Sequence, residues 1–173
     1  QVEFLGVILE ELGIEPIANP GSIKDLHTAL NNFLLKNHSK GRRTILIVDE
    51  AQNLAIDVLE QIRMLTNLET SRQKLLQITL IGQPELRQVL ARNDLRQLAQ
   101  RITGRYQLEP LSKEDTCEYI QHRILVAGGN GAIFTQAACK EAFRLSQGVP
   151  RIINVICDRA LLGAYTQEQL TIT

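Results

Sequence analysis

The sequence contains little cysteine, carries no net charge and lacks any long hydrophobic run. Its three cysteines, Cys117, Cys139 and Cys157, lie far apart and never in C-x-x-C spacing. This argues against a disulfide framework and against a zinc site, and it favours a reducing compartment. Nineteen basic residues balance nineteen acidic ones, so the overall charge gives no reason to expect a nucleic acid or an anionic membrane as partner.

No stretch approaches 18 consecutive apolar residues and no signal peptide is visible, so we expect no membrane-spanning segment in this chain. The chain begins at Gln1, without Met, inside an amphipathic pattern, and we expect it to be an excised part of a longer protein. Its 173 residues and its apolar fraction of 44% suffice for one domain with a sizeable core, or for one domain and a small appendage.

The pattern of apolar residues divides the chain after residue 109. In residues 1–109, the continuous apolar run Thr44–Val48 predicts a strand buried on both faces, as in parallel sheets, and the stretch Leu75–Gly82, rich in Leu and Ile, predicts a second buried strand. A weaker run at Arg105–Leu108 predicts a short further strand. Residues 110–173 have helical patterns only. We therefore predict an α/β core, with a parallel sheet and helices on both faces, followed by a small all-helical lid.

Helical periodicity and end signals locate the expected helices. In the first domain they cover about residues 2–12, 23–34, 53–68 and 95–102, with a short one from residue 84, and in the second about 112–125, 136–146 and 150–164. Ser22 is positioned to cap the second helix. Ser112, with Asp115 three residues later, resembles a capping box.

Two adjacent acids, Asp49 and Glu50, follow the first apolar run directly. Acids at the carboxyl end of a buried parallel strand lie where open α/β sheets bind ligands. In P-loop ATPases an aspartate at this point, in the Walker B strand, helps to hold Mg²⁺, and a neighbouring glutamate can polarise the attacking water. We assign these roles to Asp49 and Glu50, against the alternative of two ordinary acids at a strand end.

Gln83 follows the second apolar run, after Gly82. If the two strands are neighbours, Gln83 lies near Asp49 and Glu50, where it could hydrogen-bond the attacking water or the γ-phosphate. The alternative is a turn residue before Pro84.

Several arginines follow, and most of them should be solvated surface. Arg101 and Arg105 are the candidates for a guanidinium that stabilises a transferring phosphoryl group. Arg151 lies in the first turn of the helix that Pro150 begins, where the helix dipole disfavours a cation. A phosphate or an acid nearby would offset that cost.

These signals occur in the order of an AAA+ ATPase: Walker B, sensor 1, arginine finger and sensor 2. Over nearly its whole length, the chain resembles the general secretion pathway protein A family. The resemblance is carried by Val48–Leu54, Leu65–Thr70, Leu80–Leu86, Leu98–Ile102 and Gly148–Asn154. The MSHA pilus-biogenesis ATPases are similar, and the transposition ATPases are more distant relatives.

The resemblance implies an enzyme that binds ATP and Mg²⁺. It makes Asp49 and Glu50 the Walker B pair and Gln83 sensor 1, and it makes Arg151 sensor 2. Arg101 matches the arginine-finger position best, with Arg105 as runner-up. Such a finger acts on the nucleotide of a neighbouring subunit, which implies a homo-oligomer in a ring or a head-to-tail arrangement.

The family also implies a place in the cell. Its members act at the cytoplasmic face of the bacterial inner membrane, where they help a membrane partner to assemble the type II secretion machinery. Whether secretion or a pilus is served stays open, as does the oligomer size. Two alternatives remain: a non-hydrolysing interaction module on the same scaffold, and a DNA-targeting transposition ATPase. The second is not favoured, because Lys40, Arg42 and Arg43 form the only local basic cluster.

The sequence departs from the family in lacking the phosphate-binding loop G-x-x-x-x-G-K-[ST]. We expect this loop and the first strand before Gln1, and we expect the fragment alone to bind little ATP and to be inactive. In such sheets the first strand lies between those predicted at Leu75–Gly82 and Arg105–Leu108. Without the first strand, a gap remains between these two strands. We expect the two to pair directly, a strand to be exchanged between chains, or one strand to be left displaced.

Overall fold

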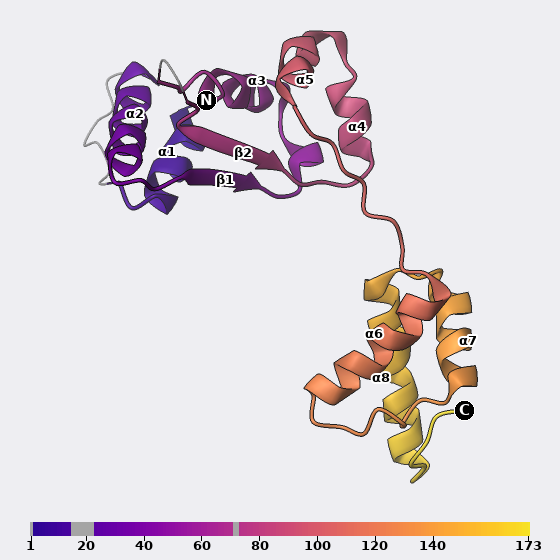
Figure 1. Ribbon diagram of the computed structural model, residues 1–173. Helices are drawn as coiled ribbons and strands as arrows, with labels where there is room; N and C mark the ends of the chain where they lie inside the picture. The colour runs from indigo at the N-terminus through magenta and orange to yellow at the C-terminus, as the bar shows by residue number, and fades with distance from the viewer. Residues whose placement is uncertain (1, 15–22, 71–72) are drawn as a thin grey trace. The chain divides into compact units, whose positions relative to one another are not determined.

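The computed structural model describes residues 2–14, 23–70 and 73–173 (Figure 1). The chain divides into two compact units, Gln1–Arg105 and Tyr106–Thr173. Residues 102–112 between helices form neither helix nor strand, and the predicted domain boundary after residue 109 falls in this same segment.

The first unit is an α/β unit built around two parallel strands. Its elements are α1 (Val2–Glu11), α2 (Ile23–Ser39), β1 (Thr44–Val48), the 3₁₀ turn η1 (Ala51–Asn53), α3 (Ile56–Leu65), β2 (Leu76–Leu80), α4 (Glu85–Leu90), the 3₁₀ turn η2 (Asn93–Leu95) and α5 (Arg96–Arg101). In the sheet, Thr44 lies opposite Leu76 and Val48 opposite Leu80. The predicted α/β class with a parallel sheet is confirmed. The predicted cap Ser22 lies outside the described residues.

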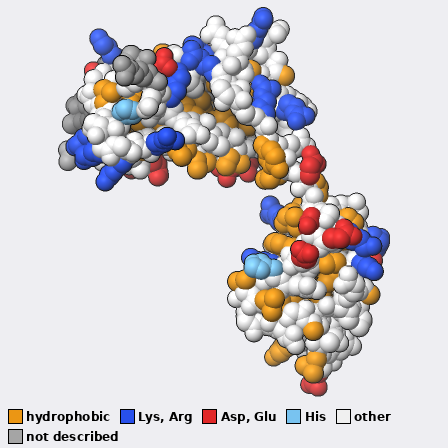
Figure 2. All heavy atoms as spheres, in the orientation of Figure 1, with side chains coloured by type: hydrophobic (Ala, Val, Ile, Leu, Met, Phe, Trp, Pro, Cys, Tyr) orange, Lys and Arg blue, Asp and Glu red, His pale blue; other side chains and the backbone are white. Residues whose placement is uncertain are grey.

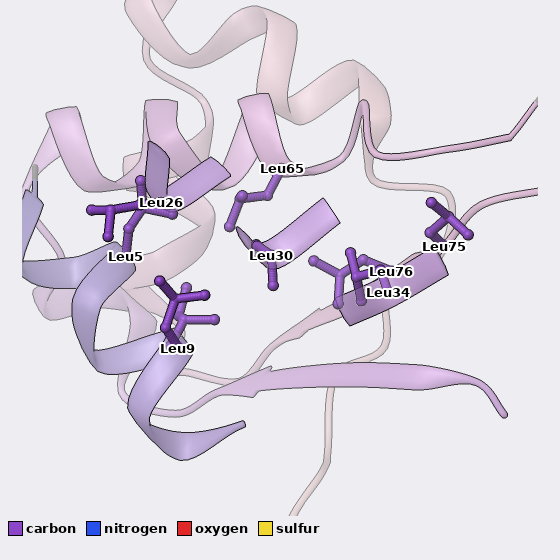
Figure 3. Close-up of a cluster of buried hydrophobic side chains, with 9 residues drawn as sticks. Leu5, Leu9, Leu26, Leu30, Leu34, Leu65, Leu75 and Leu76 are labelled. Carbon is purple, nitrogen blue, oxygen red and sulfur yellow. The ribbon is translucent and has the colours of Figure 1, made fainter. Parts of the chain in front are cut away.

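Leucines dominate the core between α1, α2 and the sheet. Figure 3 shows Leu5 and Leu9 of α1 gathered with leucines of α2, with Leu65 at the end of α3 and with Leu76 at the start of β2. The α1 helix ends where Gly13 takes a left-handed conformation, φ 67°, which glycine adopts without steric cost. The chain can therefore turn back so that α1 and α2 cover the same region.

A second core lies between α3, α5 and the carboxyl half of the sheet. Leu59 and Ile62 of α3 pack with Leu95 and Leu98, and partly buried residues of both strands contact them. The strand residues in the two cores are Leu46, Val48, Leu76, Ile78 and Leu80. In the observed register all five lie on one face of the sheet.

The opposite face of β1 is exposed, so the prediction that this strand is buried on both faces is wrong for that face. Ile45 is 54% exposed and Ile47 62% exposed, and Figure 2 shows hydrophobic side chains gathered along the strands. The physical reason is that the described helices pack on the face of Leu46 and Val48 only. The continuous apolar run gave no sign of this difference between the faces.

The strand predicted at Arg105–Leu108 is also absent, since this segment has no regular structure. Tyr106 is 90% exposed and Leu108 85% exposed, and no described segment pairs with them. A short strand needs a hydrogen-bonded neighbour, and an apolar–polar pattern alone does not supply one. The gap expected between the second strand and residues 105–108 is therefore not closed by direct pairing, because neither β1 nor β2 pairs with this segment.

The second unit is a bundle of three helices, α6 (Lys113–Val126), α7 (Gln136–Ser146) and α8 (Pro150–Thr166). All three were predicted from periodicity. Its core contains Cys117, Ile120, Cys139 and Ile153, and the cysteines there are free thiols. The predicted cap of α6 is present: Ser112 Oγ accepts a hydrogen bond from the Asp115 N–H at 3.1 Å.

None of the helices in the described parts of the chain is long and apolar enough to cross a lipid bilayer.

Candidate active site

The carboxyl ends of β1 and β2 bring Asp49, Glu50 and Gln83 to one edge of the sheet. Pairing continues past both strands, because the Ile81 N–H donates to Val48 O at 2.8 Å and the Ala51 N–H donates to Ile81 O at 2.9 Å. These bonds hold the residues after β1 against those after β2. The proximity predicted from parallel strand ends is therefore observed.

Glu50 has a left-handed backbone, φ 51° and ψ 36°. For a residue with a Cβ this conformation costs about 1–2 kcal/mol. Two hydrogen bonds offset the cost: the Glu50 N–H donates to Asp49 Oδ1 at 2.8 Å, and Glu50 O accepts from the Asn53 N–H at 2.9 Å. The result is a tight turn in which Gln83 Nε2 donates to Glu50 Oε2 at 3.4 Å.

Gln52 joins the two chain segments and was missed from the sequence as a site residue. Its Nε2 donates to Glu50 Oε2 at 2.5 Å, and its Oε1 accepts the backbone N–H of Gln83 at 3.0 Å. Its only signal in the sequence is its place two residues after Glu50. That spacing says nothing of a contact to a residue 31 positions later.

The carboxylates of Asp49 and Glu50 are exposed, and no described Lys or Arg side chain forms an ion pair with either. Two uncompensated carboxylates supply oxygen ligands of the kind that Mg²⁺ prefers. In the described residues no group of three or more His, Cys, Asp or Glu side chains could hold a metal ion. Mg²⁺ bound with a nucleotide commonly takes one or two protein carboxylates, with phosphates and water completing its shell. Asp49 and Glu50 can supply these one or two carboxylates.

Arg101 lies elsewhere in the first unit. Its Nη1 donates to Thr66 Oγ1 at 3.2 Å, beside the residue that ends α3. Leu65, the last residue of α3, packs in one cluster with Leu76 at the start of β2, whereas Glu50 follows the carboxyl end of β1. The contact of Arg101 with Thr66 therefore lies toward the amino end of the strands, away from Glu50. The pKa of the nearby Glu69 is lowered by its hydrogen bond and ion pair with Lys74, and further by the charge of Arg101.

Arg105 forms a hydrogen bond to the backbone, from Nη2 to Ala99 O at 3.3 Å. It lines a small hollow with Arg92 and Arg96. Arg92 pairs with Asp94 through two hydrogen bonds, of 3.1 and 2.9 Å, which raise the pKa of Arg92 and lower that of Asp94. Arg101 and Arg105 thus have different surroundings, although they are four residues apart.

Arg151 belongs to the second unit, where it is exposed in the first turn of α8. The described residues give its guanidinium no hydrogen bond or ion pair. Asn154, one turn later, accepts a hydrogen bond from the Tyr119 hydroxyl at 3.1 Å and so ties α8 to α6. The helix start that carries Arg151 is therefore fixed within its own unit.

Comparison with known proteins gives two matches. A protein-family profile described as AAA domain matches residues 1–90, which include Asp49, Glu50, Gln52 and Gln83. The chain is also 49% identical, over 165 residues, to a general secretion pathway protein A of Aeromonas hydrophila. That match covers 95% of this chain and 30% of the relative, so the chain spans less than a third of the relative's length.

Proposed function

Because the chain belongs to the AAA domain family, we propose that it is part of a Mg²⁺-dependent ATPase whose cycle of binding and hydrolysis drives conformational change. The observation that supports this most is the meeting of Asp49, Glu50 and Gln83 at the carboxyl edge of the two parallel strands. Their order along the chain is that of Walker B followed by sensor 1.

Each of these residues has a role in the proposal. Asp49 would hold Mg²⁺, and Glu50 would accept the proton of the attacking water as it develops nucleophilic character. Gln83 orients the water or the γ-phosphate with its amide. Bound ATP with Mg²⁺ supplies the phosphoryl group that the water attacks. The loop that holds the phosphates would come from residues outside this sequence.

The arginines complete the proposal. Arg101 is the finger, and its contact with Thr66, toward the amino end of the strands and away from Glu50, supports action on the site of a neighbouring copy. Arg105 is the runner-up. Arg151 is sensor 2, held at the start of α8. The active form is accordingly a homo-oligomer with head-to-tail interfaces.

We propose that this ATPase serves assembly of the type II secretion machinery, or of an MSHA-type pilus, at the cytoplasmic face of the inner membrane with a membrane-protein partner. The support is the 49% identity to a general secretion pathway protein A. Nucleic acid is not a favoured partner, because the 19 basic residues are balanced by 19 acidic ones.

The test is ATP hydrolysis by the longer chain that contains this sequence. We expect turnover that requires Mg²⁺ and is lost in Asp49→Asn, whereas Glu118→Gln, an exposed acid on α6, retains it. ATP binding without turnover in the unaltered protein would support the interaction module instead. Turnover that appears only with duplex DNA would support the transposition type.

A further inference from the structure

We propose that Gln52 is a positioning residue that couples the Glu50 carboxylate to the loop carrying Gln83. This inference rests on the proposed function, in which Glu50 activates water. It adds a residue that passes a displacement of the loop after β2 directly to the catalytic carboxylate.

The hydrogen bonds fix the orientation of the Gln52 side chain. The Gln83 backbone N–H can only donate, so the amide oxygen of Gln52 must face it, at 3.0 Å. The amide NH₂ of Gln52 then faces Glu50 Oε2, at 2.5 Å, which accepts when the carboxylate is ionised. A glutamine matches both partners at once. An acid at position 52 would match the Gln83 N–H and oppose the Glu50 carboxylate.

Gly82 allows this contact. A Cβ at residue 82 would lie 2.6 Å from Gln52 Oε1 and 3.4 Å from Gln52 N. The first distance is too short for any real contact between these atoms, so a Cβ would displace the Gln52 amide, which is the far end of a flexible side chain. The φ of Gly82 is not positive, so glycine matters here through the space that it leaves: the Gln52 amide packs against its α-carbon, and alanine would push that amide away from the Gln83 N–H.

Glu50 is held through one oxygen only. The two side-chain hydrogen bonds that its carboxylate accepts, from Gln52 at 2.5 Å and from Gln83 at 3.4 Å, both end at Oε2. Within the described parts of the chain, Oε1 accepts no hydrogen bond and is left to receive the proton of a water. Because Gln52 also holds the Gln83 backbone, a shift of residues 82–83 moves Oε2 and turns Oε1 with it.

The first experiment needs no nucleotide. Amide hydrogen exchange of Gln83 is measured by NMR in the unaltered chain, in Gln52→Ala, in Gly82→Ala and in Gln88→Ala. Loss of the hydrogen bond should speed exchange of the Gln83 amide ~10-fold in the first two variants, as expected for ~1.4 kcal/mol of lost protection. Gln88 is an exposed glutamine on α4, and its variant should exchange as the unaltered chain does.

The second experiment uses the longer ATPase. Gln52→Ala should lower kcat ~10- to 100-fold, as expected for a misplaced catalytic group, with the KM for ATP changed less than about twofold. Because Gln52→Ala and Gly82→Ala remove one contact, their combination should be no slower than the slower single variant. If Gly82→Ala does not fold, Gln52→Ala and Gln52→Leu carry the test.

Two outcomes overturn the inference. One is unchanged exchange of the Gln83 amide in Gln52→Ala. The other is normal turnover in Gln52→Ala while Glu50→Gln is inactive, which leaves the proposed function intact. Normal turnover in Glu50→Gln would instead overturn the function itself, so the two failures are distinguishable.

Discussion

Gly148 lies directly against the backbone of Leu111. The Leu111 N–H donates to Gly148 O at 2.9 Å, and a Cβ on residue 148 would lie 2.0 Å from Leu111 O. Gly148 also has a left-handed φ of 76°. The turn before Pro150 is thereby fixed to the residue that leads into α6, and the start of α8, with Arg151, is fixed with it.

Gly148→Ala should destabilise the second unit severely. The left-handed conformation alone costs about 1–2 kcal/mol with a Cβ, and the overlap with Leu111 adds to it. The matched control is Gly163→Ala in α8, where a Cβ meets nothing within 4 Å and where alanine should stabilise the helix by ~0.5–1 kcal/mol. Denaturant unfolding measures both. Equal effects of the two substitutions would contradict this account of the turn.

Replacing an isoleucine in the buried core on α3 should lower the unfolding free energy more than replacing one on the exposed face of β1. Ile62→Thr removes a methyl group and buries a hydroxyl where the side chain is 1% exposed, at a cost of at least about 2 kcal/mol. Ile47→Thr, at a side chain 62% exposed, should change the unfolding free energy by no more than ~0.5 kcal/mol. A loss at Ile47 as large as that at Ile62 would show that the outer face of β1 is covered.

The buried thiols should make stability fall at high pH. Burial raises the pKa of Cys139 from 9.0 to about 11, with a smaller contribution from Cys117. Burial also raises that of Cys157 to about 11, with help from Asp158. Between pH 9 and 11 the unfolded chain loses these protons while the folded chain keeps them, so the stability present below pH 9 is lost across this window.

The measurement is the unfolding free energy at pH 8 and at pH 10.5, for the unaltered chain and for Cys139→Ala. The variant should lose less stability between the two pH values, because one of the two raised pKa values is gone. An identical loss in both proteins would mean that burial does not shift the pKa of Cys139.

The position of Arg101 predicts complementation between two inactive variants. In the longer ATPase, Arg101→Ala should lower turnover ~10³-fold, the usual effect of removing a finger. Mixing Arg101→Ala with Glu50→Gln should restore activity, because an intact Glu50 in one copy can meet an intact Arg101 in the next. Full activity of Arg101→Ala alone, with turnover lost in Arg105→Ala, would transfer the assignment to Arg105.

The helices, the two parallel strands and the meeting of Gln83 with Glu50 could be predicted, because they follow from local periodicity and from the rule that parallel strands end at one edge. The exposure of Ile47 could not, since it depends on how many layers cover the sheet. Nor could the absence of a strand at Arg105–Leu108, because its apolar pattern does not reveal whether a neighbouring strand is present to pair with it.

The Gln52 bridge could not be predicted for a different reason. It depends on a left-handed conformation at Glu50, which favours glycine, and on the close approach of Gly82 to a side chain 30 positions earlier. Neither has a signature in the sequence. The residue joining the two predicted site segments therefore becomes visible only in three dimensions.

The most direct test of the central claim is single-site removal of the Glu50 charge. ATP binding and ATP turnover are measured for Glu50→Gln in the longer chain, with Glu118→Gln as control. We predict that Glu50→Gln binds ATP with unchanged affinity and has lost turnover, because the amide cannot take the proton of the attacking water. Normal turnover by Glu50→Gln would contradict the account.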